Sequence, residues 1–133
     1  MKGKTYNLDV LTTSGLFDLD VVSRFFYSTQ DYFDALTDFE LNYRRDLANH
    51  TPAVVAYSPE SREDFIKECF DVRSVFVRLG MPELLRNLDN LENAAITKNE
   101  KGFSDGQVTM RATIKIYKET IKKAETRWKM TRS

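Results

Sequence analysis

The side chains that bind metals or catalyse reactions are scarce in this sequence. It has a single histidine, His50, and a single cysteine, Cys69. A structural zinc site takes about four such ligands, so these two residues are too few. Helical di-metal sites place a glutamate three residues before a histidine, and position 47 is a leucine. The residue types therefore predict no metal site.

Other catalytic arrangements are also missing. The sequence has no glycine-rich phosphate-binding motif. Neither Ser58 nor Ser61 has a histidine base at a recognisable spacing. The carboxylates are numerous but are distributed as surface charge would be. Because an enzyme needs convergent polar groups with tuned protonation, we expect a chain that is not an enzyme and uses no cofactor.

His50 and Cys69 each have two possible roles. His50 falls at the C-terminal end of a predicted helix, where a protonated imidazole favours the helix dipole; the alternative is a phosphoacceptor or metal ligand. Cys69 falls on the apolar stripe of another predicted helix, which favours a small buried hydrophobe over a reactive thiol. A lone cysteine forms no internal disulfide, which suits a reducing cytoplasm.

Helical periodicity dominates the chain, which has only five glycines and three prolines. After an irregular arm, residues 1–14, a first helix is expected from about residue 16 to residue 28. Its apolar face comprises Leu19, Val22, Phe25 and Phe26.

The following helices are marked by their caps and breaks. A joint at residues 29–31, capped by Thr29 or Asp31, leads into a second helix that ends at Asn49, before a proline. The other predicted elements are a third helix from Ser58-Pro59 to Gly80, a fourth helix from Pro82, a polar loop over 98–106 and a fifth helix over 107–129.

These elements predict an all-α fold. The length fits one domain, residues 1–133. We expect an antiparallel four-helix bundle with a short additional N-terminal helix.

The charges argue against nucleic-acid binding. Twenty basic residues balance twenty acidic ones, whereas binding to phosphates requires a basic excess. The C-terminal stretch 118–133 has six Lys or Arg against two Glu, and we interpret it as a solvated helix face rather than a membrane or nucleic-acid patch. No apolar run approaches the ~20 residues of a membrane span, and no secretory signal follows Met1. We expect a cytoplasmic protein that binds no membrane.

The third and fourth helices carry a resemblance. The segment from Cys69 to Gly80 is similar to the phosphotransfer segment of histidine-containing phosphotransfer (HPt) domains. That family has a small residue, histidine, any residue, leucine, lysine and glycine, then an apolar residue and glycine that end the helix. The next helix in the family carries leucines up to a Leu-Glu pair, as residues 82–92 do. The resemblance covers about residues 15–125 and implies a four-helix bundle.

Three positions depart from the family pattern. Phe70 occupies the phosphoacceptor position, Arg73 matches the lysine that helps to position the phosphoryl group, and Ser74 matches the glycine that gives the partner room. Phenylalanine has no nucleophilic nitrogen, so phosphoryl transfer at this position is impossible. The resemblance therefore implies a degenerate member that docks a response-regulator receiver domain without transferring phosphate.

The third helix has more apolar surface than a bundle requires. Its core stripe consists of Phe65, Cys69, Val72, Phe76 and Leu79. A second stripe, about 100° around the helix, carries Ile66, Phe70, Arg73 and Val77. Either the N-terminal helix or arm covers this second stripe, or the stripe stays exposed as an interaction patch anchored by Phe70.

The leading hypothesis is a non-catalytic signalling module in a two-component phosphorelay. Its predicted interaction patch comprises Ile66, Phe70, Arg73, Ser74 and Val77, with Arg73 available to an acidic cluster of the receiver. The alternative is a structural or assembly protein that forms a homodimer through the Ile66/Phe70/Val77 stripe. A monomer and a weak homodimer are both compatible with the sequence.

Overall fold

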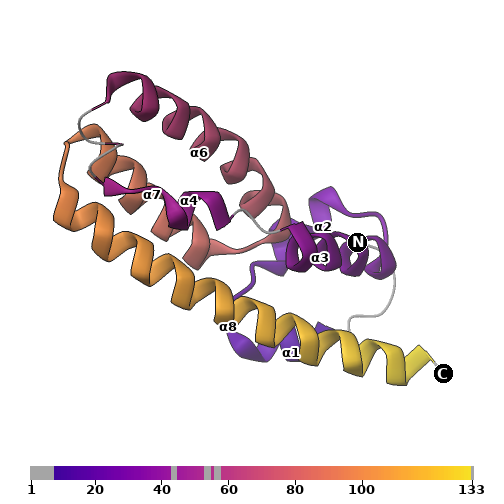
Figure 1. Cartoon of the computed structure of the whole chain (residues 1–133). Coiled ribbons are helices and arrows are strands. Elements are labelled where there is room, and N and C mark those ends of the chain that lie inside the picture. The colour runs from indigo at the N-terminus through magenta and orange to yellow at the C-terminus, as the bar shows by residue number, and fades with distance from the viewer. Residues whose placement is uncertain (1–7, 43–44, 53–54, 56–57, 133) are drawn as a thin grey trace.

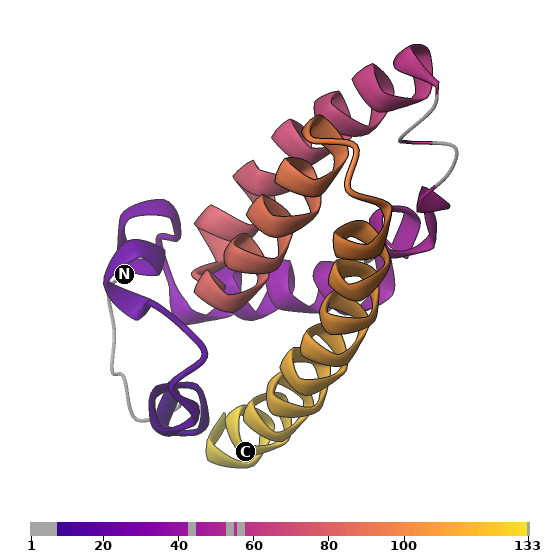
Figure 2. The same cartoon turned by 90° about the vertical axis from the view of Figure 1, so that its left-hand side faces the viewer.

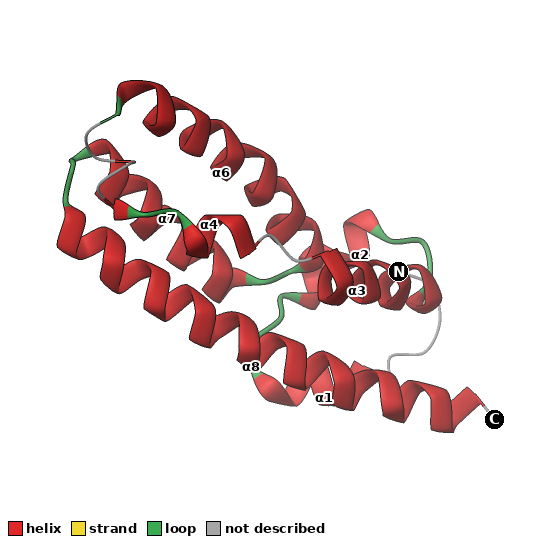
Figure 3. Ribbon diagram, viewed as in Figure 1, coloured by secondary structure: helices red, strands yellow, loops and turns green. Residues whose placement is uncertain are grey.

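The computed structural model describes residues 8–42, 45–52, 55 and 58–132. Within these residues the chain is mostly helical and contains no strand, which confirms the predicted all-α class (Figure 3). The described helices are α1 (Asp9–Ser14), α2 (Leu19–Phe25), α3 (Thr29–Asn42), α4 (Arg45–Asn49), α6 (Pro59–Leu79), α7 (Pro82–Ile96) and α8 (Glu100–Arg132).

Three long helices, α6, α7 and α8, lie side by side (Figure 1). At the N-terminus of α6 the Ser58 hydroxyl accepts a hydrogen bond from the Ser61 amide, so Ser58 is the cap that the sequence predicts. Gly80 ends α6 with φ +68°, and Pro82 sits in the first turn of α7. Glycine adopts this left-handed conformation without steric cost, which lets α7 turn back along α6. A second short turn, with Lys98 at φ 59°, returns the chain along α7 as α8.

Helix α3 crosses this layer of three helices instead of running along it (Figure 2). Phe39 of α3 packs edge-on against Phe76 of α6 at a centroid distance of 6.4 Å. Phe33 stacks on Trp128 of α8 at 5.6 Å. The Tyr32 hydroxyl donates to the Leu79 carbonyl at 2.9 Å. Because of this crossing, the antiparallel four-helix arrangement expected from the sequence is not confirmed.

The N-terminal segment is joined to the core through Tyr117 of α8. Its buried hydroxyl donates to the Leu16 carbonyl at 2.6 Å and accepts from the Glu83 amide at 3.3 Å. The ring of Phe17 packs edge-on against it. Burial raises the pKa of Tyr117 to about 12, so the hydroxyl stays protonated and keeps donating.

Several predicted boundaries were wrong. Residues 9–14 of the expected arm form α1, which packs on α8 and buries Leu11; residues 1–7 of the arm lie outside the described residues. The expected loop over 98–106 is helical from Glu100 onward. The two glycines that suggest a loop have other roles here: Gly106 lets α8 approach Leu91 of α7 closely, and Gly102 lies against the side chain of Asn99, which caps α8.

The second predicted helix is represented by two helices, α3 and α4, with residues 43–44 between them outside the described residues. The residue that caps α3 is Ser28, whose hydroxyl accepts a hydrogen bond from the Asp31 amide at 3.1 Å. The predicted caps, Thr29 and Asp31, do not have this role. The fifth helix is longer than expected and ends at Arg132. Among the described helices, none has both the length and the apolar character needed to cross a membrane.

Candidate functional site

Helix α6 has the two faces that its periodicity predicts. All five residues of the predicted core stripe are buried. On the other side, Phe70 is 71% exposed and Ser74 is exposed, while Ile66 and Val77 are partly exposed. Leaving an aromatic ring in water forgoes the stabilisation that burial would give. Helix α6 thus carries a large apolar side chain on the surface at Phe70.

A surface hollow of about 390 Å³ surrounds Phe70. Four residues of the predicted interaction patch, Phe70, Arg73, Ser74 and Val77, line it, and Ile66 does not. Two further lining residues, Phe25 and Arg78, were missed from the sequence. We call the hollow that these six residues line the Phe70 hollow.

Helix α2 positions Phe25 beside the end of α6. The Asp18 amide donates to the Gly80 carbonyl at 2.8 Å, and the Asp18 side chain caps α2 by accepting from the Val21 amide. Val22 is fully buried against Gly80. Phe25, on the same short helix, is 50% exposed, so its assignment to the apolar core face was wrong. Helix α2 therefore borders the second stripe and leaves Phe70 uncovered.

Arg73 forms two ion pairs within the molecule. Its guanidinium Nη2 donates to Asp89 Oδ1 at 2.6 Å and to Glu92 Oε1 at 3.2 Å, both on α7. Burial opposes the charged form of Arg73, but the bonds to the two carboxylates outweigh it and raise its pKa. Arg73 thus links α6 to α7 across the edge of the hollow.

The side chains that line the hollow include few groups suited to catalysis. None of its six side chains is a carboxylate or an imidazole that could accept a proton from Ser74. Cys69, the adjacent residue, is a buried free thiol. Its burial, together with the charge of Glu92, raises the thiol pKa to about 12, so the nucleophilic thiolate does not form near neutral pH.

His50 lies against a different face of α6. Its ring packs edge-on against Phe65 at 5.0 Å, and its Nε2 lies 3.7 Å from Glu68 Oε2. Its carbonyl accepts a hydrogen bond from the Gln107 side chain. Phe70 is about 160° around the helix from Glu68, so His50 lies on another side of α6 than Phe70. No group of three or more metal-binding side chains comes together in the described parts of the chain.

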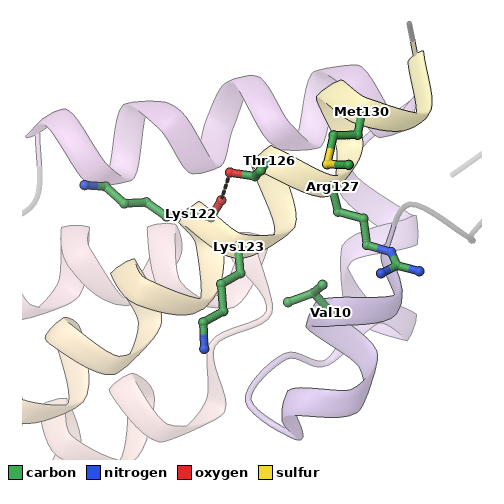
Figure 4. A pocket seen from close by; sticks show the side chains of 6 residues that line it. All are labelled: Val10, Lys122, Lys123, Thr126, Arg127 and Met130. Atoms are coloured by element: carbon green, nitrogen blue, oxygen red, sulfur yellow. Dashed lines mark hydrogen bonds between the residues drawn. The ribbon is translucent and has the colours of Figure 1, made fainter.

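A second hollow lies between α1 and the C-terminal half of α8 (Figure 4). Val10 faces Lys123 and Arg127, whereas Lys122 points away from it. Arg127 Nη2 is 3.8 Å from Asp9 Oδ2 of α1. The lysines and Arg127 are exposed, as expected for the solvated face predicted for this basic end.

Comparison of the chain with family models, curated proteins and solved structures finds no match. The likeness to HPt domains therefore depends on the residues quoted above and remains a prediction.

Proposed function

We propose that this chain is a non-catalytic interaction module, similar to an HPt domain, that binds a response-regulator receiver domain through the Phe70 hollow without transferring phosphate. The observation that carries the proposal is the 71% exposure of Phe70 at the position of the phosphoacceptor. A phenylalanine retained on the surface of a folded domain is the type of residue that anchors protein interfaces.

The surroundings of Phe70 support binding. Phe25 and Val77 extend the apolar surface around it, so a partner can bury a contiguous patch. Arg78 lines the hollow, is exposed and forms no ion pair with the described residues. Since Arg73 is already bonded to two carboxylates, Arg78 is the cation available to a partner. The aspartate pocket of a receiver would supply the matching acidic groups.

The absence of phosphoryl transfer follows from the side chains. The phosphoacceptor position has a phenylalanine, and the one histidine lies on another side of α6, in contact with Phe65 and Glu68. An aspartyl phosphate docked at the Phe70 hollow would find no imidazole to attack it.

The experiment is a screen of purified receiver domains against the whole chain, each receiver tested unphosphorylated and phosphorylated with labelled phosphate. We expect one receiver to bind while its label stays on the receiver or is released to water. Acid-labile label on the chain would contradict the non-transferring role, and mass spectrometry would then show whether His50 holds it. No binding by any receiver would contradict the choice of partner.

In the alternative hypothesis, two copies of the chain form a homodimer through the same exposed stripe of α6. Size-exclusion chromatography with light scattering on the chain alone distinguishes the two. A mass that stays monomeric across concentration supports a hetero-partner. A mass that doubles, and returns to the monomer value in Phe70→Ala, supports the dimer through Ile66, Phe70 and Val77.

A further inference from the structure

The hollow between α1 and the C-terminal half of α8 has a volume of about 720 Å³ (Figure 4). This volume is within the range of pockets that bind small molecules, about 300–1,000 Å³. We call it the α1–α8 hollow. The α8 residues that line it are exposed and Val10 of α1 is partly exposed, so a ligand reaches them without a change in the fold. The lining residues are Val10, Lys122, Lys123, Thr126, Arg127 and Met130.

Two cations at this hollow lack a strong acidic partner among the described residues. Lys123 is exposed and forms no ion pair within the described parts of the chain. Arg127 Nη2 lies 3.8 Å from Asp9 Oδ2, which is too long for a hydrogen bond, and both side chains are more than half exposed. Lys122 points away from the hollow, and its charge acts on Glu40 of α3. The hollow therefore presents an ammonium and a guanidinium group.

The charges of Lys123 and Arg127 favour an anion. The two residues are four positions apart on α8, a spacing at which like charges destabilise a helix. An anion that lies beside both groups removes this repulsion. No carboxylate lines the hollow to compete with it. A carboxylate suits this position, because the paired N–H groups of a guanidinium match its two oxygens.

The hollow also has accessible apolar surface. Met130 is 72% exposed, and Val10 on the facing helix is partly exposed. The aliphatic stems of Lys123 and Arg127 add methylene surface. A ligand that covers this surface removes it from water, which stabilises the complex. The stretch of α8 from residue 122 to residue 130 is about 12 Å long, about the length of an extended chain of ten carbon atoms.

These two features together determine which anion fits. An inorganic anion would pair with the cations but leave Val10 and Met130 uncovered. A nucleotide base binds by stacking on aromatic rings, and no aromatic residue lines the hollow. A carboxylate at the end of one aliphatic chain uses both the cations and the apolar surface.

We propose that the α1–α8 hollow binds the anion of a free fatty acid. Its carboxylate accepts hydrogen bonds from Arg127 and Lys123, and its chain lies against Val10 and Met130. The site is separate from the Phe70 hollow and does not depend on the proposed receiver binding.

The test is a titration of the whole chain with three probes, followed by the ¹³C-methyl signals of its valines and methionines. Decanoate has both parts of the ligand, acetate has the carboxylate alone, and decyltrimethylammonium has the same chain with the opposite charge. Each is titrated to about 10 mM, because a ligand of about a dozen non-hydrogen atoms is expected to reach about millimolar affinity.

Decanoate should shift the Val10 and Met130 signals saturably, and the other two probes should bind at least about tenfold more weakly. The absence of a saturable shift with decanoate would overturn the proposal. Equal affinity for decanoate and decyltrimethylammonium would also overturn it, because the cations would then have no part in binding.

Two variants at exposed positions, which should fold normally, test the two parts of the site. Arg127→Gln removes the guanidinium charge and should weaken decanoate binding at least about tenfold. Met130→Gln removes apolar contact and should weaken it at least about threefold. Lys115→Gln, at an exposed position of α8 outside the hollow, is the control and should bind as wild type does. Unchanged affinity in Arg127→Gln and Met130→Gln would overturn the proposal even if decanoate binds.

Discussion

Phe65 and Phe70 lie five residues apart on α6 in opposite surroundings. Phe65 is fully buried and its ring packs against Phe103 and His50, whereas Phe70 is 71% exposed. Five residues turn a helix by about 140° beyond a full turn, which moves the side chain from the core to the surface. An exposed ring contributes little to folding, and this exposure is the basis of the proposed interface.

Alanine substitutions of the two phenylalanines should change the free energy of unfolding by different amounts. Phe70→Ala should change the free energy of unfolding by no more than about 0.5 kcal/mol, as surface substitutions do. Phe65→Ala should cost about 3–5 kcal/mol, because it leaves a cavity in the core. Thermal or urea unfolding measures both. If Phe70→Ala unfolds as readily as Phe65→Ala, Phe70 is a core residue and the hollow is not a binding surface.

Glu40 of α3 introduces a pH dependence. Burial, then the hydrogen bond and repulsion from Glu125 of α8, raises the pKa of Glu40 from 4.5 to about 7, against the opposing effect of Lys122 and Lys118. A carboxyl with a raised pKa favours folding in its protonated form. The chain should therefore lose stability as the pH rises from 4.5 to about 7, and the loss should level off above that.

The variant Glu40→Gln should remove this dependence. Above pH 7 it should be more stable than wild type by about 1 kcal/mol, since solvent screens the partly exposed pair, and below pH 4.5 the two should match. Glu119→Gln, at an exposed position on α8, serves as the control. Denaturant unfolding across this range measures the effect. Parallel profiles for wild type and Glu40→Gln would contradict the coupling between α3 and α8.

At the scale of elements, the position of α2 depends on Gly80. This residue ends α6 at φ +68°, and a Cβ there would lie 2.6 Å from the Asp18 carbonyl oxygen and 2.7 Å from Val22. Gly15 has a similar φ of +71° but no atom within 4 Å of the added Cβ. An alanine at Gly15 would therefore cause backbone strain alone, whereas an alanine at Gly80 would add a steric clash with α2.

Gly80→Ala should destabilise the chain by about 2–4 kcal/mol, the sum of a left-handed alanine and a clash with α2. Gly15→Ala should cost only about 1–2 kcal/mol. Because α2 carries Phe25, the Gly80 variant should also weaken partner binding under conditions where it remains folded. Unfolding and binding measurements on both variants decide this. Equal costs for the two would show that α2 is not fixed by Gly80.

The sequence predicted the boundaries of those helices that begin or end with clear capping residues. Ser58-Pro59 begins α6, Gly80 ends it and Pro82 begins α7, because caps act through neighbouring residues alone. Helix α1 was missed because Thr12, Thr13 and Ser14 favour it little, and its stability comes from burying Leu11 against other elements. The start of α8 was missed because Gly102 and Gly106 suggest a loop, whereas Gly106 lies against Leu91 of α7 and Gly102 against the capping side chain of Asn99.

The candidate site was predictable in part for the same reason. The periodicity of α6 separates Phe70 from the buried stripe, so its exposure could be anticipated from the sequence. Phe25 could not be added to it, because no local pattern shows that α2 ends beside Phe70. Arg78 could have been, since it follows Ser74 by four residues on the same helix and falls on the same face. The bond of Arg73 to Asp89 and Glu92 joins two helices and likewise depends on their packing.

At the scale of the whole molecule, three long helices form a layer that α3 crosses (Figures 1 and 2). Apolar periodicity predicts which face of each helix is buried. It does not determine the angle at which two helices cross, because the same apolar stripe can be buried at several crossing angles. In this arrangement α2 lies against the C-terminal end of α6, and α3 contacts the C-terminal parts of α6 and α8. The outward face of α6 remains exposed at Phe70, which is where we propose that a partner binds.

The most direct test is the affinity of the receiver that binds in the screen for wild type, Phe70→Ala and Ile116→Ala. Ile116 is an exposed apolar residue on α8, outside the Phe70 hollow, so its variant controls for general loss of apolar surface. Truncation of an aromatic anchor should weaken binding by at least about 30-fold, or about 2 kcal/mol, while the control stays within about twofold. Equal affinities for the three proteins would show that the Phe70 hollow is not the binding surface.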